Sequence, residues 1–81
     1  MRYSTTAHFD REFKKFSEEI RVAFRKQVQF LLGDIRHPSL RSKKYDEANG
    51  VWQARITGNV RLFFRIEGDV YRLLNIRRHT D

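Results

Sequence analysis

The sequence predicts a single α+β domain in which a helical hairpin packs on one face of an antiparallel sheet of about four strands. Three observations lead to this prediction. Apolar residues recur at helical spacing in the first half, they alternate with polar residues in the last third, and short glycine-containing turns separate the alternating segments. At 81 residues the chain is too short to bury two separate cores. We therefore expect one domain over residues 1–81.

Two amphipathic helices are expected in the first half. Phe9, Phe13 and Phe16 recur at i, i+4 and i+7, which places them on one face of a helix over residues 7–16. Ser17 is expected to cap a second helix, because its hydroxyl can accept a hydrogen bond from the first turn. The break between the helices is short, so we expect a hairpin. The apolar stripe of the second helix consists of Ile20, Phe24, Val28, Leu31 and Leu32.

Three strands are expected in the last third of the chain, where apolar and polar residues alternate. They run from Val51 to Ile56, from Val60 to Glu67 and from Val70 to Arg77. Gly58-Asn59 and Gly68-Asp69 join them, and we expect positive φ angles at these dipeptides, as tight hairpins require. If the alternation continues through the third strand, the odd-numbered residues of 61–79 share one face.

Two further segments complete the predicted fold. The short stretch Arg2–Thr6 is expected to form the fourth strand. Residues 36–50 lack a clear period and are expected to form a basic loop. With these additions the order of elements becomes β-α-α-β-β-β.

The composition narrows the possible partners. Lys and Arg number 17 against 10 Asp and Glu, which gives a formal net charge of +7, and ten of the basic residues lie after residue 35. A domain this basic is expected to bind an anionic partner, and nucleic acid or an acidic protein is the first expectation. The alternative is that the basic side chains only keep the surface soluble. The chain has no cysteine, which excludes disulfides and fits a cytoplasmic location. No apolar run approaches the roughly 20 residues of a membrane span.

Strand alternation places basic and aromatic side chains together on the sheet face that points away from the helices. Guanidinium groups bind phosphate, and an exposed phenylalanine offers a platform for a base. A plain solvated face shows the same alternation and is the alternative. The side chains expected on this face are those of Gln53, Arg55, Arg61, Phe63, Arg65, Asn75, Arg77 and His79.

Proton transfer is a further possibility at the two ends of this region. Lys43 and Lys44, with Arg41, precede the first long strand, and a lysine among other cations can lose its proton and act as a base. His79 follows the last strand, and its imidazole can donate a proton to a leaving 5′ oxygen. The histidines lack the spacing of metal ligands and no carboxylate cluster accompanies them, so no metal is expected.

These segments resemble the RelE/ParE toxins of bacterial type II toxin–antitoxin systems. The resemblance is carried by HPSLRSKK at 37–44, VWQARITGNVRLFFRIEGD at 51–69 and YRLLNIRRH at 71–79. The preceding helical hairpin matches as well, so the resemblance covers essentially the whole chain. It implies the RelE-like β-α-α-β-β-β fold, in agreement with the architecture predicted above.

The resemblance also implies a function. Like the RelE-like members of the family, the chain is expected to be an endoribonuclease that cleaves mRNA, typically on the ribosome, without a metal or other cofactor, and to be neutralised by a cognate antitoxin protein. A basic residue at the position of Lys43 or Lys44 assists attack by the 2′ hydroxyl. Arginines at the positions of Arg55 and Arg61 bind the scissile phosphate, with Val60 in place of the usual tyrosine. The residue at the position of His79 is the general acid.

Several other residues are expected to bind RNA without taking part in the reaction. Many family members carry a tyrosine a few residues beyond the general acid, where it stacks on a base. This sequence has none after His79, and we expect Phe63 to supply the aromatic surface instead. The expected RNA-binding residues are Arg41, Phe63, Arg65, Arg77 and Arg78.

Two other functions stay open. The N-terminal helices also match the ParE-like branch of the family, whose members poison DNA gyrase and lack the ribonuclease residues. A basic module that binds RNA through its sheet without cleaving it would show the same charges. Lys43, Lys44 and His79 favour the ribonuclease.

Overall fold

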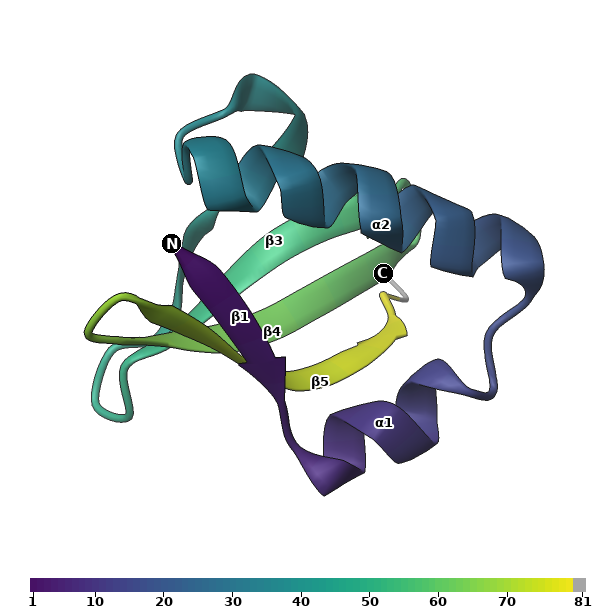
Figure 1. Ribbon diagram of the computed structural model, residues 1–81, viewed down its shortest axis with the longest axis horizontal. Helices are drawn as coiled ribbons and strands as arrows, with labels where there is room; N and C mark the ends of the chain where they lie inside the picture. The colour runs from purple at the N-terminus through teal and green to yellow at the C-terminus, as the bar shows by residue number, and fades with distance from the viewer. Residues whose placement is uncertain (80–81) are drawn as a thin grey trace.

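The computed structural model describes residues 1–79, which form a five-stranded sheet with two helices on one face (Figure 1). The strand order is β1-β5-β4-β3-β2. No helix in the described part of the chain is long and apolar enough to cross a membrane. The elements are β1 (Arg2–Thr5), α1 (Ala7–Phe13), α2 (Glu18–Gly33), the 3-10 helix η1 (Pro38–Leu40), β2 (Lys43–Asp46), β3 (Val51–Thr57), β4 (Val60–Glu67) and β5 (Val70–Arg78).

The α+β class is confirmed, but the sheet is larger than the predicted four strands and is mixed. Lys43–Asp46 pairs with β3 as an antiparallel edge strand, so the predicted loop over 36–50 is wrong in this part. The side chains of β2 are exposed or half-exposed, and the apolar alternation that marks a strand is missing from it. At the other edge β1 runs parallel to β5, with Arg2 opposite Val70. The neighbour of β1 in the sheet, β5, is the last strand in the sequence, so both helices and the three other strands lie between the two along the chain.

The two helices begin where hydroxyl side chains cap them. Thr6 accepts a hydrogen bond from the backbone N–H of Phe9 at 3.1 Å, and Ser17 accepts one from that of Ile20 at 3.4 Å, which confirms the predicted start of α2. The first helix ends at Phe13, one turn earlier than predicted.

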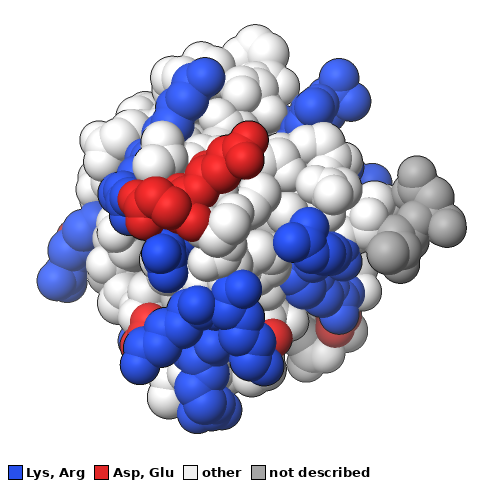
Figure 2. Space-filling view, turned by 90° about the vertical axis from the view of Figure 1, so that its right-hand side faces the viewer, with Lys and Arg blue, Asp and Glu red and all other residues white. Residues whose placement is uncertain are grey.

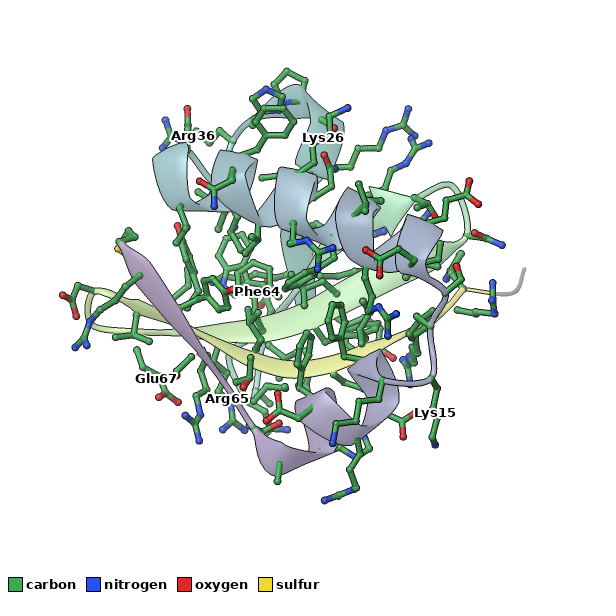
Figure 3. The ribbon with its side chains drawn as sticks, turned by 45° about the vertical axis from the view of Figure 1, so that its right-hand side comes forward. Lys15, Lys26, Arg36, Phe64, Arg65 and Glu67 are labelled. Atoms are coloured by element: carbon green, nitrogen blue, oxygen red, sulfur yellow. The ribbon has the colours of Figure 1, made fainter. Side chains whose placement is uncertain are left out.

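The core lies between the helices and the sheet. In Figure 3, Phe64 lies between β4 and α2, whereas Arg65 and Glu67 lie on the other side of the strand. The aromatic rings of the two helices also meet, since the Phe13 and Phe24 ring centroids are 4.9 Å apart. The apolar core residues are Phe9, Phe24, Val28, Leu31, Leu40, Ala54, Ile56, Val60, Leu62, Phe64, Tyr71, Leu73 and Ile76.

A register shift in β5 breaks the predicted alternation. Phe63 lies opposite Asn75 and Phe64 lies opposite Leu73, so that Leu74 is an extra residue on β5. As a result Tyr71 and Leu73 are buried in the core with Ile76. The expectation that all odd-numbered residues of 61–79 share the open face is therefore wrong for Tyr71 and Leu73, the odd-numbered β5 residues before the bulge. Beyond the bulge the predicted alternation holds.

The two hairpin turns differ from one another. Gly68 has a positive φ of 63°, as predicted for the turn between β4 and β5. Neither Gly58 nor Asn59 has a positive φ, so this part of the prediction is wrong. Between β3 and β4 the register shifts at Arg55/Thr57, and the Thr57 hydroxyl donates to Oδ1 of Asn59 at 3.0 Å, which closes the turn without a left-handed residue.

Candidate nucleic-acid interface

Two rows of side chains cross the sheet face that the helices leave open. In the arginine row, Arg61 of β4 lies between Arg55 of β3 and Arg77 of β5. Adjacent strands are about 4.8 Å apart, so three guanidinium groups start from neighbouring positions. The next row along the strands, called the Lys43 row, consists of Lys43, Gln53, Phe63 and Asn75.

Two hollows lie over these rows. One of about 210 Å³ is lined by Arg41, Lys43, Gln53, Arg55 and Arg61. The second, of about 130 Å³, has Gln53 and Arg61 in its wall as well, together with Tyr45, Phe63, Arg77, Arg78 and His79. Because the two hollows share Gln53 and Arg61, they meet above the middle of the sheet. Lys43 lies at one end of the combined cleft and His79 at the other.

The register of β2 separates the two candidate lysines. Lys43 lies opposite Gln53 and faces the open side of the sheet. Lys44 lies opposite Trp52 on the other face, with its Nζ 5.8 Å from the centre of that indole ring. Only Lys43 therefore lies beside the arginine row.

Tyr45 is a residue of this site that the sequence did not point out. Its ring packs edge-on against Phe63 at 4.8 Å, and its hydroxyl accepts a hydrogen bond from Nη2 of Arg77 at 3.0 Å. Tyr45 is 54% exposed, whereas Phe63 is only 6% exposed, so the prediction of an exposed Phe63 is wrong. The Arg77 guanidinium covers Phe63 as well, 4.4 Å from its ring centre. The exposed aromatic surface is that of Tyr45.

Arg61, in the middle of the arginine row, is held in place by the adjacent turn between β3 and β4. Its Nη1 donates to the carbonyl oxygen of Thr57 at 2.7 Å, with longer contacts to those of Gly58 and Val60. The side chain is half-buried. These bonds hold the guanidinium between the two hollows, which reduces the entropy lost when it binds an anion.

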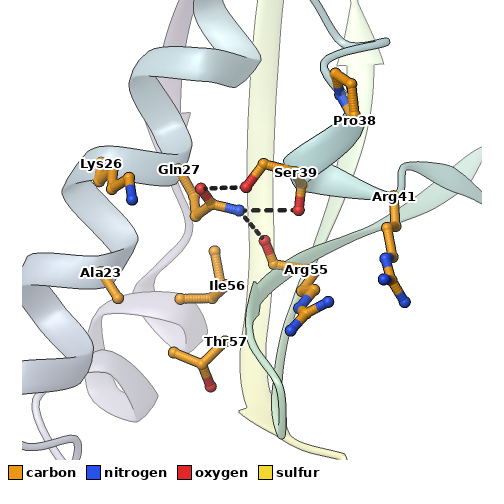
Figure 4. Close-up of a pocket in the computed structure, with 9 residues that line it drawn as sticks. All are labelled: Ala23, Lys26, Gln27, Pro38, Ser39, Arg41, Arg55, Ile56 and Thr57. Atoms are coloured by element: carbon orange, nitrogen blue, oxygen red, sulfur yellow. Dashed lines mark hydrogen bonds between the residues drawn. The ribbon is translucent and has the colours of Figure 1, made fainter.

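A buried amide on α2 holds the backbone of Arg55 and that of Ser39, two residues before Arg41. Gln27, 5% exposed, donates to the backbone carbonyls of Ser39 at 3.2 Å and Arg55 at 2.9 Å and accepts from the Ser39 hydroxyl at 3.0 Å (Figure 4). The Arg55 carbonyl lies at the register shift of β3, where Gln27 supplies a hydrogen-bond donor. Arg41 follows η1 in the left-handed conformation, with φ 47° and ψ 43°.

Two predicted RNA-binding arginines lie apart from the cleft centre. Arg65 lies opposite Val51, beyond the Lys43 row, and its Nε donates to the backbone carbonyl of Asn49 at 3.0 Å. Arg78 lines the His79 end, but its guanidinium carbon lies 5.5 Å from the Phe16 ring centre on the helix side. The structure thus brings together Arg41, Lys43, Arg55, Arg61, Arg77 and His79.

The cleft is electropositive because its lysine and arginine side chains form no ion pair with any acidic side chain among residues 1–79. The ion pairs found within residues 1–79 are Arg2–Asp69, Lys15–Glu12, Arg21–Glu18 and Arg25–Glu18, all outside the cleft. Basic side chains form several separate groups on the face drawn in Figure 2, so positive charge is not confined to the cleft. Within the described residues, no three His, Cys, Asp or Glu side chains are grouped so as to hold a metal ion.

Comparisons with known proteins identify the fold. No protein-family model matches the sequence, and no curated protein is significantly similar to it. Among solved structures, a YoeB/ParE toxin from Agrobacterium tumefaciens matches with a TM-score of 0.77 and 17% identity over 99% of this chain and 100% of that one. YafQ from E. coli matches with a TM-score of 0.76 and 9% identity over 94% and 90%.

A further match is a chain of the toxin–antitoxin complex RelBE2 from Mycobacterium tuberculosis. It has a TM-score of 0.68 and 27% identity, and the alignment covers 95% of both chains. All three matches span nearly the full length of both chains, so the likeness extends to the whole fold. The chain therefore has the fold of the RelE/ParE toxin superfamily, as the resemblance in its sequence implied.

Proposed function

We propose that this protein is the toxin of a type II toxin–antitoxin system, and that it cleaves mRNA on the ribosome in the cytoplasm until a cognate antitoxin binds it. The observation that carries the proposal is the placement of Lys43 and His79 at opposite ends of a cleft floored by arginines. The similarity to a YoeB/ParE toxin and to a chain of a toxin–antitoxin complex supports the role of a toxin.

The reaction needs one base and one acid on opposite sides of a phosphate. The 2′ oxygen of the RNA attacks the adjacent phosphorus while its proton passes to the amine of Lys43. The bond from phosphorus to the 5′ oxygen breaks, and that oxygen takes a proton from the imidazolium of His79. The products are a 2′,3′-cyclic phosphate and a free 5′ hydroxyl, so neither water nor a metal ion is consumed or required.

The arginine row supplies the electrostatic part of catalysis. As the 2′ oxygen attacks, an additional negative charge develops on the non-bridging oxygens of the phosphate. Arg55 and Arg61 both line the hollow that contains Lys43, and hydrogen bonds to the adjacent turn hold the Arg61 guanidinium in place before the substrate arrives. Preorganised donors of this kind lower the barrier by several kcal/mol, about 2.7–4 for a single oxyanion-hole donor.

The antitoxin is expected to be acidic, because it must cover a protein of net charge +7. Binding of the same cleft by acidic side chains would exclude RNA directly. The neutralised complex is then expected to bind RNA with lower affinity than the free toxin.

Induced expression of the wild-type chain tests the function in cells. We expect translation to stop, primer extension to show breaks within translated messages, and the His79→Ala variant to leave growth and messages intact. Lys14→Gln, an exposed change outside the cleft, is expected to behave as the wild type. Growth arrest with intact messages and disturbed DNA supercoiling would contradict the ribonuclease and favour the gyrase-poisoning alternative.

A further inference from the structure

A third hollow, with Arg55 in its wall, lies between α2, η1 and β3 (Figure 4). Its volume is about 470 Å³, more than that of either hollow over the arginine and Lys43 rows. We call it the Lys26 pocket; its polar lining consists of Lys26, Gln27, Ser39, Arg41, Arg55 and Thr57. The proposed reaction does not use Lys26, nor does it need this hollow.

The pocket concentrates positive charge that the protein leaves without a partner. Lys26 lies on α2, Arg41 directly follows η1 and Arg55 lies on β3, and no acidic side chain lines the pocket. The three side chains donate no hydrogen bond and form no ion pair with any of residues 1–79. Bringing three like charges around one hollow costs free energy in the empty protein, and an anion in the hollow removes that cost.

Hydrogen bonds hold together the backbone segments that carry the basic side chains of the pocket. The amide of Gln27 is buried and makes hydrogen bonds to both Ser39 and the Arg55 carbonyl, which ties η1 and β3 to α2. Arg41 holds a left-handed backbone conformation, which costs a residue with a side chain about 1–2 kcal/mol. Strain of this kind persists where the surrounding structure imposes it, and it is frequent at binding sites.

The position of the Lys26 pocket relative to the cleft indicates on which side of the broken bond, 5′ or 3′, the pocket lies. Arg41 and Arg55 line both the Lys26 pocket and the hollow that contains Lys43, so these two hollows are neighbours. Lys43 acts on the 2′ hydroxyl of the nucleotide on the 5′ side of the broken bond. His79, at the other end of the cleft, acts on the 5′ oxygen of the nucleotide on the 3′ side.

We infer that the Lys26 pocket binds the RNA backbone phosphate on the 5′ side of the scissile phosphate. The strand would then run from Lys26 and Arg41, across Arg55 and Arg61, to Tyr45 and His79. This inference rests on the proposed function and extends it by assigning Lys26 a binding role and by fixing the polarity of the strand.

The test measures binding of three RNA oligonucleotides to the purified full chain by fluorescence anisotropy. The first is centred on a cut site mapped for the wild type and carries a 2′-deoxy substitution at the cut nucleotide, so that it is bound but not cleaved. The second lacks the nucleotides on the 5′ side, and the third lacks those on the 3′ side. Each is measured with the wild type, with Lys26→Gln and with the matched exposed change Lys14→Gln.

We expect Lys26→Gln to weaken binding of the complete and the 3′-truncated RNA roughly fivefold at low salt, and to leave binding of the 5′-truncated RNA unchanged. The slope of log K against log salt should become shallower by about 0.7, the value for one phosphate contact to a single strand. Lys14→Gln should change neither quantity.

Two results overturn the inference. If Lys26→Gln binds all three RNAs as the wild type does, or loses affinity only for those that keep the 3′ side, the pocket does not hold the 5′ phosphate, while the proposed function is unaffected. If the wild type binds none of the three RNAs, the inference fails, whereas the proposed function, which acts on mRNA held by the ribosome, fails only if translated messages stay intact.

Discussion

At the scale of single residues, the register of β2 decides which lysine faces the substrate. Lys43 lies beside the arginine row, whereas Lys44 contacts Trp52 on the opposite face. We expect Lys43→Met to lower the rate of RNA cleavage by about 10²–10⁴, the usual contribution of a general base, and Lys44→Met to leave it within a few fold of the wild type. Cleavage rates of the two variants under single-turnover conditions check this; equal losses would contradict the assignment.

Tyr45 is the residue whose side chain presents an exposed aromatic surface in the cleft. Its hydroxyl accepts from Arg77 and its ring covers Phe63. We expect Tyr45→Ala to weaken binding of single-stranded RNA by about 1–3 kcal/mol, the value of one stacked base, because the stacking surface is lost. Tyr45→Phe keeps the ring and should retain most of that affinity. An RNA affinity that falls equally in both variants would show that the hydrogen bond to Arg77, and not stacking, is what matters.

At the scale of elements, the buried amide of Gln27 joins α2 to η1 and β3. Gln27→Leu keeps the approximate volume but leaves two carbonyl groups and the Ser39 hydroxyl without their partner. We expect the free energy of unfolding to fall by about 1–3 kcal/mol. The control is Gln29→Leu at an exposed position of the same helix, which should change it by less than about 0.5 kcal/mol. Urea unfolding of the three proteins measures both values, and equal midpoints for all three would contradict the role of Gln27.

We expect the turn between β2 and β3 to be sensitive to acid. The side-chain amide of Asn49 donates to Asp46 at 2.8 Å and its backbone N–H adds a second bond, which hold the pKa of this carboxyl below its usual value. A carboxyl whose pKa is lower in the folded state stabilises the fold above its unfolded pKa of about 4, and this contribution disappears as the pH falls through the folded pKa. The wild type should therefore lose more stability than Asp46→Asn as the pH falls below 4.

Urea midpoints of both proteins at several pH values between 5 and 2.5 check this prediction. Parallel curves for the two proteins would show that Asp46 does not contribute. Because the turn supports β2, acid is also expected to loosen the strand that carries Lys43 and Tyr45 before the core unfolds.

The elements that can be predicted from the sequence are those in which apolar residues recur at the regular spacing of a helix or a strand. The stripe of α2 and the alternation in β3 and β4 are apolar patterns created by burial on one side, so the core and the positions of Arg55 and Arg61 follow from them. The edge strand β2 buries little and leaves no such pattern, and for this reason Tyr45 was missed. The bulge at Leu74 could not be predicted from the sequence either, because a residue is extra only relative to the strand with which β5 pairs.

At the scale of the whole molecule, the fold brings three distant segments to one cleft. Lys43 precedes β3, the arginine row spans β3 to β5, and His79 follows β5. The proposed function depends on this convergence and not on the net charge, since basic groups also lie elsewhere on the surface (Figure 2). A binding module would need only the charge, whereas a ribonuclease also needs the base and the acid at opposite ends.

The most direct test of this central claim is the chemistry of the RNA ends left after incubation of a translated message with the purified protein and ribosomes. We predict 2′,3′-cyclic phosphate and 5′-hydroxyl ends with the wild type, and a loss of cleavage of at least about 10² in His79→Ala and in Lys43→Met, while both variants still bind RNA. Messages that stay intact with the wild-type protein, or cleavage that survives both substitutions, would contradict it.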